Sequence, residues 1–125
     1  MERAGISGSR AKFFLPAYEW YNDTITKWTA EQGLQLVNFT PGTLSTADYT
    51  FPELKNYRDS ETILSSIVSR EERLANGLNG FILLVHIGTD PRRTDKFYHR
   101  LPRLIDFLNM KGYAFVRIDE LLSGE

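Results

Sequence analysis

His86 is the residue of this chain with the clearest capacity for chemistry. It follows an uninterrupted apolar run at residues 81–85 and precedes a polar loop at residues 87–93, so one imidazole stands at the carboxyl end of an expected buried strand. Imidazole gains and loses a proton near neutral pH, which suits a general acid or base. A hydrogen-bonded structural histidine fits the same pattern, so the spacing alone leaves both interpretations open.

Metal binding is not favoured by the residue types. The chain has no Cys, and neither His-x-x-x-His nor Glu-x-x-His occurs, whereas zinc sites need three or four converging ligands. Asp90 and Asp95 are weak candidate ligands near His86. The other histidine, His99, falls on a helical face opposite the apolar stripe, which predicts a solvated position.

Two further groups of residues have both a functional and an ordinary interpretation. Arg92 and Arg93 either clamp an anionic substrate or solvate a loop. Tyr18, Trp20 and Tyr21 form an aromatic cluster of a kind that stacks on sugar faces and also packs ordinary cores. The glycine-rich phosphate-binding motifs and the Gly-x-Ser-x-Gly motif are absent, so nucleotide binding and serine hydrolysis lack their signatures.

Composition predicts one ordinary globular domain over residues 1–125. Of the 125 residues, 42% are hydrophobic and 25% charged, and the formal net charge is −1. This balance argues against a dedicated nucleic-acid binder. No apolar stretch approaches the ~20 residues of a membrane span. Residues 1–10 have no apolar h-region, so they do not form a signal peptide, and the localisation stays unknown.

Strands and helices are expected to alternate. Apolar runs predict strands at residues 12–15, 34–39, 81–85 and 113–118. Helical periodicity with terminal caps predicts helices that start at Asn22 or Asp23, at Ser60 and after Thr94, and end at Gly33, at Asn76-Gly77 and at Lys111-Gly112. Because Pro102 interrupts the pattern of the third helix, we expect a short first turn and a kink, followed by a regular helix that starts near Pro102. Residues 119–122 are expected to form a terminal helical turn.

This order of elements predicts a parallel sheet with right-handed crossovers. Ligand sites in such folds lie beyond the carboxyl ends of the strands, here residues 16–20, 40–57 and 86–93. Residues 40–56 form a long loop rich in turn-forming residues with Tyr49 and Phe51 among them, and loops of this length are usually functional or disordered.

Two segments resemble motifs of the NodB-type polysaccharide deacetylase family. Residues 84–86, Leu-Val-His, match that family's Leu-x-His motif, and a helix with Leu101-Pro102 follows them. Residues 13–18, Phe-Phe-Leu-Pro-Ala-Tyr, resemble the segment usually written Phe-Arg-Pro-Pro-Tyr-Gly. Residues 111–116 and 120–122 also fit the end of such a domain, so the resemblance covers nearly the whole chain.

The resemblance implies a partial (β/α) barrel of the glycoside hydrolase/deacetylase type, with about four parallel strands and three helices. The implied reaction is hydrolysis of acetyl groups from acetylated carbohydrate with a divalent metal, often zinc. His86 would be the general acid that protonates the leaving amine or alkoxide. Leu84 would line the pocket for the acetyl methyl group. Tyr18, with its backbone N–H near the oxyanion, and Trp20 would bind substrate.

The chain also departs from the family pattern. Neither Thr-Phe-Asp-Asp, which supplies the base and a metal ligand, nor His-Ser/Thr-x-x-His, which supplies two more ligands, occurs. Leu15 stands at the family's arginine, Ala17 at its second proline and Glu19 at its glycine. Residues 38–42 replace a motif that usually contains an Asp and a Trp, which predicts that His86 lacks the charged partner that is usual in the family.

We therefore expect the carboxyl-terminal part of a deacetylase-like domain, from a parent protein that is compatible with an extracytoplasmic location. Such a chain would hold no metal itself and would be inactive alone. It would self-associate, or pair with the absent amino-terminal half, through open strand edges and apolar faces. The alternatives are a non-catalytic carbohydrate-binding or scaffold protein that uses Tyr18, Trp20 and Tyr49, and a small enzyme that uses His86 with Asp90 or Asp95.

Overall fold

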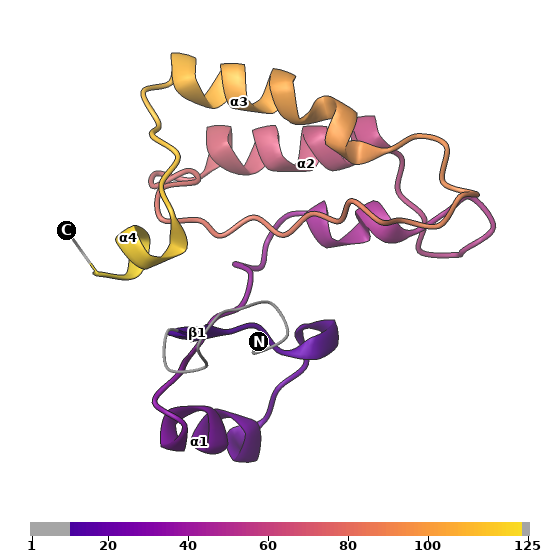
Figure 1. Ribbon diagram of the computed structural model, residues 1–125. Helices are drawn as coiled ribbons and strands as arrows, with labels where there is room; N and C mark the ends of the chain where they lie inside the picture. The colour runs from indigo at the N-terminus through magenta and orange to yellow at the C-terminus, as the bar shows by residue number, and fades with distance from the viewer. Residues whose placement is uncertain (1–10, 124–125) are drawn as a thin grey trace. The chain divides into compact units, whose positions relative to one another are not determined.

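The computed structural model describes residues 11–123, which form two compact units that divide between Phe39 and Thr40 (Figure 1). The expectation about residues 1–10, that they form no signal peptide, lies outside the described residues. In the described part of the chain, no helix combines the length and the apolar character needed to cross a membrane.

The first unit is a small strand–helix–strand arrangement. It contains β1 (Phe13–Phe14), the 3₁₀ turn η3 (Ala17–Glu19), α1 (Asp23–Glu31) and β2 (Gln35–Leu36), and the two strands pair in parallel. Asn22 caps α1, because its Oδ1 accepts a hydrogen bond of 3.0 Å from the Ile25 N–H. Gly33 follows α1 with φ +70°, the left-handed conformation that glycine favours after a helix. Both ends of this helix are as predicted.

The second unit consists of helices that pack around one apolar core. Its elements are η4 (Ser45–Tyr49), α2 (Ser60–Arg73), η5 (Phe97–Arg100), α3 (Leu101–Met110) and α4 (Ile118–Ser123). In Figure 1, α2 and α3 run side by side. The core is formed by buried residues of these two helices and of neighbouring segments, namely Ile63, Leu64, Ile67, Leu78, Phe97, Leu104 and Leu108.

The helix ends of this unit agree with the predictions from the sequence except at the two ends of α2. The N-cap of α2 is Asp59 rather than Ser60, because the Asp59 carboxylate accepts the Thr62 N–H at 2.7 Å. The helix ends at Arg73 instead of reaching Asn76-Gly77, because Leu74 takes an extended backbone conformation. The short turn η5 before α3, with Pro102 in the first turn of the helix, is as predicted.

The expected partial barrel of four parallel strands is wrong. The described residues contain one sheet of two short parallel strands, β1 and β2, which belong to the first unit. Residues 81–85 and 113–118, expected as strands, belong to no sheet, and Ile118 is the first residue of α4. The α/β alternation is therefore present once, and the rest of the described fold consists of helices joined by turns and extended segments.

The hydrogen bonds of residues 81–86 explain why this segment is not a strand in a sheet. The Phe81 N–H donates to the Leu78 carbonyl in a turn, and Ile82 exchanges hydrogen bonds with the backbone and side chain of Thr40. The His86 N–H donates to an Asp48 carboxylate. A turn, a loop and a side chain thus take the positions that a neighbouring strand would occupy in a sheet.

Candidate functional site

Residues 81–86 run as extended backbone along the core and end at His86. The side chains of Phe81, Leu83 and Val85 pack against that core. Because successive side chains of an extended chain point to opposite sides, Leu84 and His86 lie on the side away from it. Both are half-buried. This alternation places Leu84 beside the imidazole on one face.

Asp48 contacts His86 through both carboxylate oxygens. Oδ1 lies 2.6 Å from the ring atom Nδ1, and Oδ2 accepts a hydrogen bond of 2.6 Å from the His86 backbone N–H. The Asp48 side chain is fully buried, whereas 34% of the His86 side chain is exposed. A buried acid therefore holds the backbone and one edge of the imidazole, while part of the ring faces solvent.

Asp48 is buried because η4 packs against α2. At the start of this turn, the Leu44 N–H donates to Ser66 Oγ of α2 at 3.0 Å. At its end, the fully buried Thr50 donates from Oγ1 to the Ala47 carbonyl at 2.6 Å. The two hydrogen bonds anchor the turn at both ends, so the carboxylate occupies a defined position.

The pair determines which imidazole nitrogen carries the hydrogen. A carboxylate only accepts hydrogen bonds, so Nδ1 carries the hydrogen and donates it to Asp48. No group within residues 11–123 forms a hydrogen bond to Nε2, which is left for a ligand. An acid that orients a histidine in this way leaves Nε2 to transfer a proton.

Two apolar side chains lie next to His86: Tyr49 contacts its ring in space, and Ile87 is the next residue in the chain. The Tyr49 ring stands edge-on to the imidazole, with centroids 5.5 Å apart and planes at 68°. Tyr49 is 49% exposed and Ile87 is 80% exposed. An aromatic and an aliphatic surface therefore accompany the acid–base group.

The loop after His86 is held together by its own charges. Asp90 accepts hydrogen bonds from Arg92 Nε and Nη2 at 3.0 and 2.8 Å, and these bonds lower the pKa of Asp90 to about 2. The Arg92 guanidinium also lies 3.7 Å from the centroid of the Phe51 ring. Lys96 Nζ donates to the carbonyls of Thr89 and Asp90. Arg92 is therefore committed to Asp90 and does not form an anion clamp.

The candidate carboxylate ligands do not join His86. Asp95 accepts the Ser60 N–H at 2.6 Å and so holds the start of α2, while Asp90 pairs with Arg92. Within residues 11–123, no three His, Asp or Glu side chains are grouped to hold a metal ion. His99 is exposed, as predicted.

The remaining predicted site residues lie in the first unit. Tyr18 is 94% exposed and Trp20 is 62% exposed. Tyr18 and Glu19 have φ values of +57° and +55°, a left-handed conformation that strains residues other than glycine. Asn38 Nδ2 donates to the Glu19 carbonyl at 2.8 Å and so helps to hold this turn. The structure places Tyr18 and Trp20 in one unit and His86 and Leu84 in the other.

Asp48 is the functional residue that the sequence analysis missed. The partner that is usual in the family has no counterpart in residues 38–42, but Asp48, which is 38 positions away from His86 in the chain, is in direct contact with it. The available signal was an acidic residue directly before an aromatic one, Tyr49, in the long loop after the second expected strand. Aspartate is equally typical of turns, so this signal alone does not distinguish the two roles.

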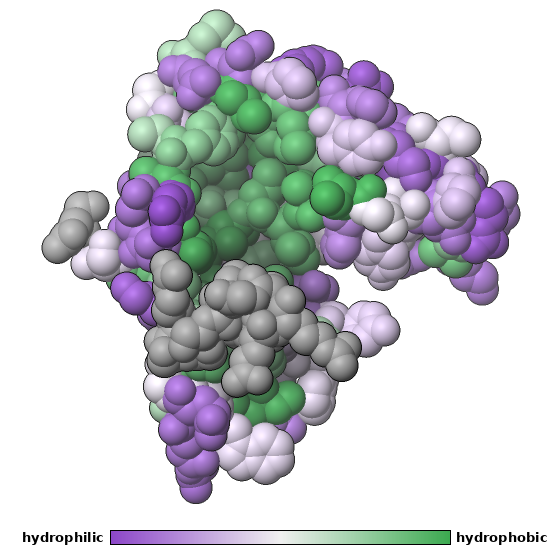
Figure 2. Space-filling model, viewed as in Figure 1, coloured by the Kyte–Doolittle hydropathy of each residue, from purple (hydrophilic) through white to green (hydrophobic). Residues whose placement is uncertain are grey.

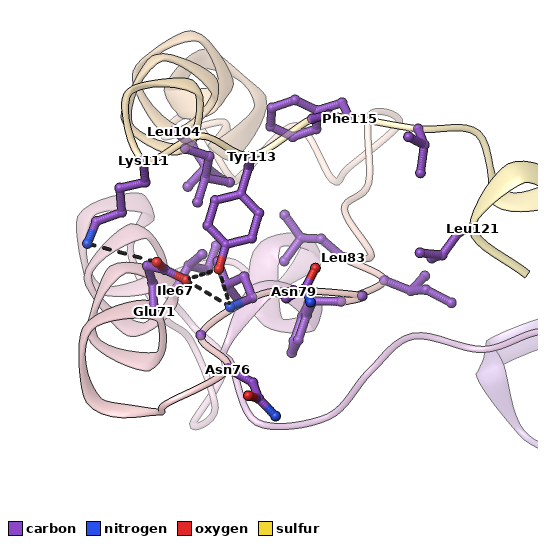
Figure 3. Close-up of a pocket in the computed structure, with 18 of the residues that line it drawn as sticks. Ile67, Glu71, Asn76, Asn79, Leu83, Leu104, Lys111, Tyr113, Phe115 and Leu121 are labelled. Carbon is purple, nitrogen blue, oxygen red and sulfur yellow. Dashed lines mark hydrogen bonds and ion pairs between the residues drawn. The ribbon is translucent and has the colours of Figure 1, made fainter. Parts of the chain in front are cut away.

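The second unit also contains an apolar groove of about 1020 Å³ between α2, α3 and the extended segments at residues 78–83 and 113–116. Figure 2 shows it as a hollow lined by hydrophobic residues. In Figure 3, Leu83, Leu104 and Phe115 contribute apolar side chains to it. At one end of the groove, Glu71, Lys111 and Tyr113 form a polar cluster.

Glu71 is the centre of that polar cluster. The Tyr113 hydroxyl donates to Glu71 Oε2 at 2.6 Å, and the Leu78 N–H donates to the same oxygen at 2.8 Å (Figure 3). Lys111 Nζ lies 3.8 Å from Glu71 Oε1. The hydrogen bond to Glu71, followed by burial, raises the pKa of Tyr113. The cluster ties the end of α2 to the segment after α3.

Comparison of the chain with protein-family models, with curated proteins and with solved structures finds no match.

Proposed function

We propose that this chain contributes the general acid of a carbohydrate deacetylase, with His86 as the acid and Asp48 as the residue that orients it. The observation that carries the proposal is the contact between the buried Asp48 carboxylate and His86 Nδ1 at 2.6 Å. It supports the resemblance of residues 84–86 to the Leu-x-His motif, because Asp48 provides a charged partner for the histidine.

In the proposed step, the protonated His86 gives the hydrogen on Nε2 to the leaving nitrogen or oxygen of the sugar. Addition of a hydroxide ion from solvent to the acetyl carbon forms the tetrahedral oxyanion. The bond between this carbon and the leaving atom then breaks, its electrons remain with the leaving atom that receives the proton, and the electron pair of the oxyanion re-forms the carbonyl. Asp48 stabilises the imidazolium before transfer and keeps the hydrogen on Nδ1 throughout. The product is a free amine or hydroxyl on the carbohydrate and acetate.

Leu84 takes a supporting role in this proposal. The half-buried Leu84 lies on the face of residues 81–86 that also carries His86, which suits contact with an acetyl methyl group.

The metal ion that the resemblance implies finds no fitting donor set in the described residues. Both Asp48 oxygens are engaged by His86, and the carboxylates of Asp90 and Asp95 are engaged by Arg92 and Ser60. The contribution of this chain to the reaction is therefore the proton transfer at His86.

The test has a genetic and an enzymatic arm. Sequencing upstream of the Met1 codon should find in-frame Thr-Phe-Asp-Asp and His-Ser/Thr-x-x-His motifs, and a stop codon without them would overturn the proposal.

In the enzymatic arm, acetate release from N-acetylglucosamine oligomers and from O-acetylated xylan is measured on the protein from the native gene. His86→Ala should lower kcat about 10²–10⁴-fold, and the exposed His99→Ala should leave it unchanged. Full activity in His86→Ala, or no acetate release by wild type, would overturn it.

A second candidate function is non-catalytic carbohydrate binding, which the exposed aromatic residues of the first unit favour. Trp20 and Trp28 are each 62% exposed, and Tyr21 is 50% exposed. Both tryptophans of the chain lie in this unit, so their fluorescence reports directly on an added oligosaccharide. Saturable quenching without acetate release, abolished in Trp20→Ala and kept in His99→Ala, would favour this function over the deacetylase.

A further inference from the structure

Arg93 has the largest fully buried side chain in the described part of the chain. Its Nη1 donates to the carbonyls of Thr50 and Arg58 at 2.6 and 2.9 Å, and its Nη2 donates to Ser60 Oγ at 3.2 Å. All three acceptors lie between η4 and the first turn of α2, whereas Arg93 lies in the loop that follows His86. One guanidinium therefore joins two segments that are distant in the sequence.

Packing alone does not explain an arginine at this position. No carboxylate within residues 11–123 forms an ion pair with Arg93, and its Nε has no hydrogen-bond partner there. A buried charge without a counter-charge is unfavourable, and an apolar side chain of similar volume is often equally stable or more stable. What arginine adds is a rigid fork of donors that reaches several acceptors at once.

The acceptors connect Arg93 to the site. Thr50 follows Asp48 by two positions, is fully buried, and is tied to η4 by the hydrogen bond from its Oγ1 to the Ala47 carbonyl. On the other side, the Arg93 N–H donates to the Asp90 carbonyl at 3.0 Å within the loop after His86. A shift of the guanidinium would therefore move the loop that carries Asp48 relative to the loop that follows His86.

We propose that Arg93 is a positioning residue that keeps Asp48 within hydrogen-bond distance of His86 Nδ1. The inference rests on the proposed function only for its catalytic consequence, because the Asp48–His86 contact exists whatever the reaction is. Lysine at this position keeps the charge, but its single ammonium group cannot reproduce the fork, so the contact should loosen in Arg93→Lys.

The experiment is nitrogen-15 NMR of the histidine rings in the full chain. The chain has two histidines, so His99 provides an internal reference in every sample. In wild type, the His86 Nδ1 hydrogen should exchange slowly with solvent. In Arg93→Lys, it should exchange at least about tenfold faster, because losing one hydrogen bond to a charged group shifts the opening equilibrium by that factor or more. The His99 signals should not change.

Leu108→Ala is the matched control, because it removes apolar contacts from the core at α3 and leaves the hydrogen-bonding groups of Arg93, Asp48 and His86 unchanged. It should keep the slow exchange at His86, whereas a merely structural role for Arg93 predicts equal changes in both variants. Slow exchange in a folded Arg93→Lys would overturn the proposal.

If Arg93→Lys does not fold, the proposal is tested by measuring hydrogen exchange in the wild-type protein at increasing urea concentrations. The Arg93 Nη and His86 Nδ1 hydrogens should then open together before global unfolding, and separate openings would overturn it. None of these results depends on deacetylase activity.

Discussion

The energetic coupling between Asp48 and His86 can be measured by a double-mutant cycle. His86→Ala removes the imidazole but keeps the backbone N–H, so one of the two donors to the buried carboxylate is lost. Asp48→Asn keeps the shape and removes the charge. We expect each single change to lower the free energy of unfolding by about 1–3 kcal/mol, the range for leaving a buried polar group without its partner.

The structure decides where in that range the loss falls. Asp48 is fully buried, which favours the upper part, but 34% of the His86 side chain is exposed, so water can replace the missing imidazole in His86→Ala. We therefore expect about 1–2 kcal/mol for His86→Ala and about 2–3 kcal/mol for Asp48→Asn. Because both changes remove the same interaction, the double variant should lose less than the sum, with a coupling of about 1 kcal/mol or more.

The assay is urea unfolding followed by far-UV circular dichroism, because α2 and α3 belong to the unit that holds the pair. Tryptophan fluorescence is the control, since both tryptophans lie in the other unit and should report the same midpoint in all variants. Losses in the single variants that add up to within about 0.5 kcal/mol in the double variant would refute the reasoning, because independent sites behave in that way.

Three further predictions concern caps, pH and association. Asp59→Ala should destabilise α2 by about 1 kcal/mol in urea unfolding at neutral pH. The Thr62 hydrogen bonds lower the pKa of Asp59, so the difference should disappear as acid protonates the carboxyl group. The pKa of Tyr113 is raised in the folded protein, so the protonated hydroxyl contributes its full share to the free energy of unfolding below the ordinary pKa of 10.0. This contribution is lost as the pH rises from 10.0 through the raised pKa, so Tyr113→Phe should flatten the stability profile in alkaline urea titrations. Sedimentation velocity should detect self-association, weakened by Phe115→Asp at the groove; a monomer at every concentration would contradict this.

The sequence predicts the helices well because helix ends are local. Asn22 accepts the N–H of a residue three positions away, and Gly33 adopts the left-handed conformation that its missing side chain permits. Pro102 is tolerated only in the first helical turn, which determines where α3 begins. Each of these signals operates within one turn of chain, so no knowledge of the tertiary fold is needed to read it.

The strands and the site depend on distant residues, and there the sequence is a weaker guide. Residues 81–85 have the apolar pattern of a buried strand, but a strand in a sheet needs a partner strand, and the partners here are Thr40, a turn and a side chain. His86 was identified from its position after this run. Its partner Asp48 is 38 positions away, and nothing in the pattern around either residue specifies the other.

The apolar groove has a consequence for experiments with hydrophobic dyes. Anilinonaphthalene sulfonate fluoresces on exposed apolar surface, and its binding is commonly taken as the mark of a molten globule. A groove of about 1020 Å³ beside Phe115, which is 60% exposed, offers such a surface in the native fold. Dye binding by this protein should therefore accompany intact near-UV circular dichroism and a cooperative thermal transition. A screen that discards dye-positive preparations would reject correctly folded material.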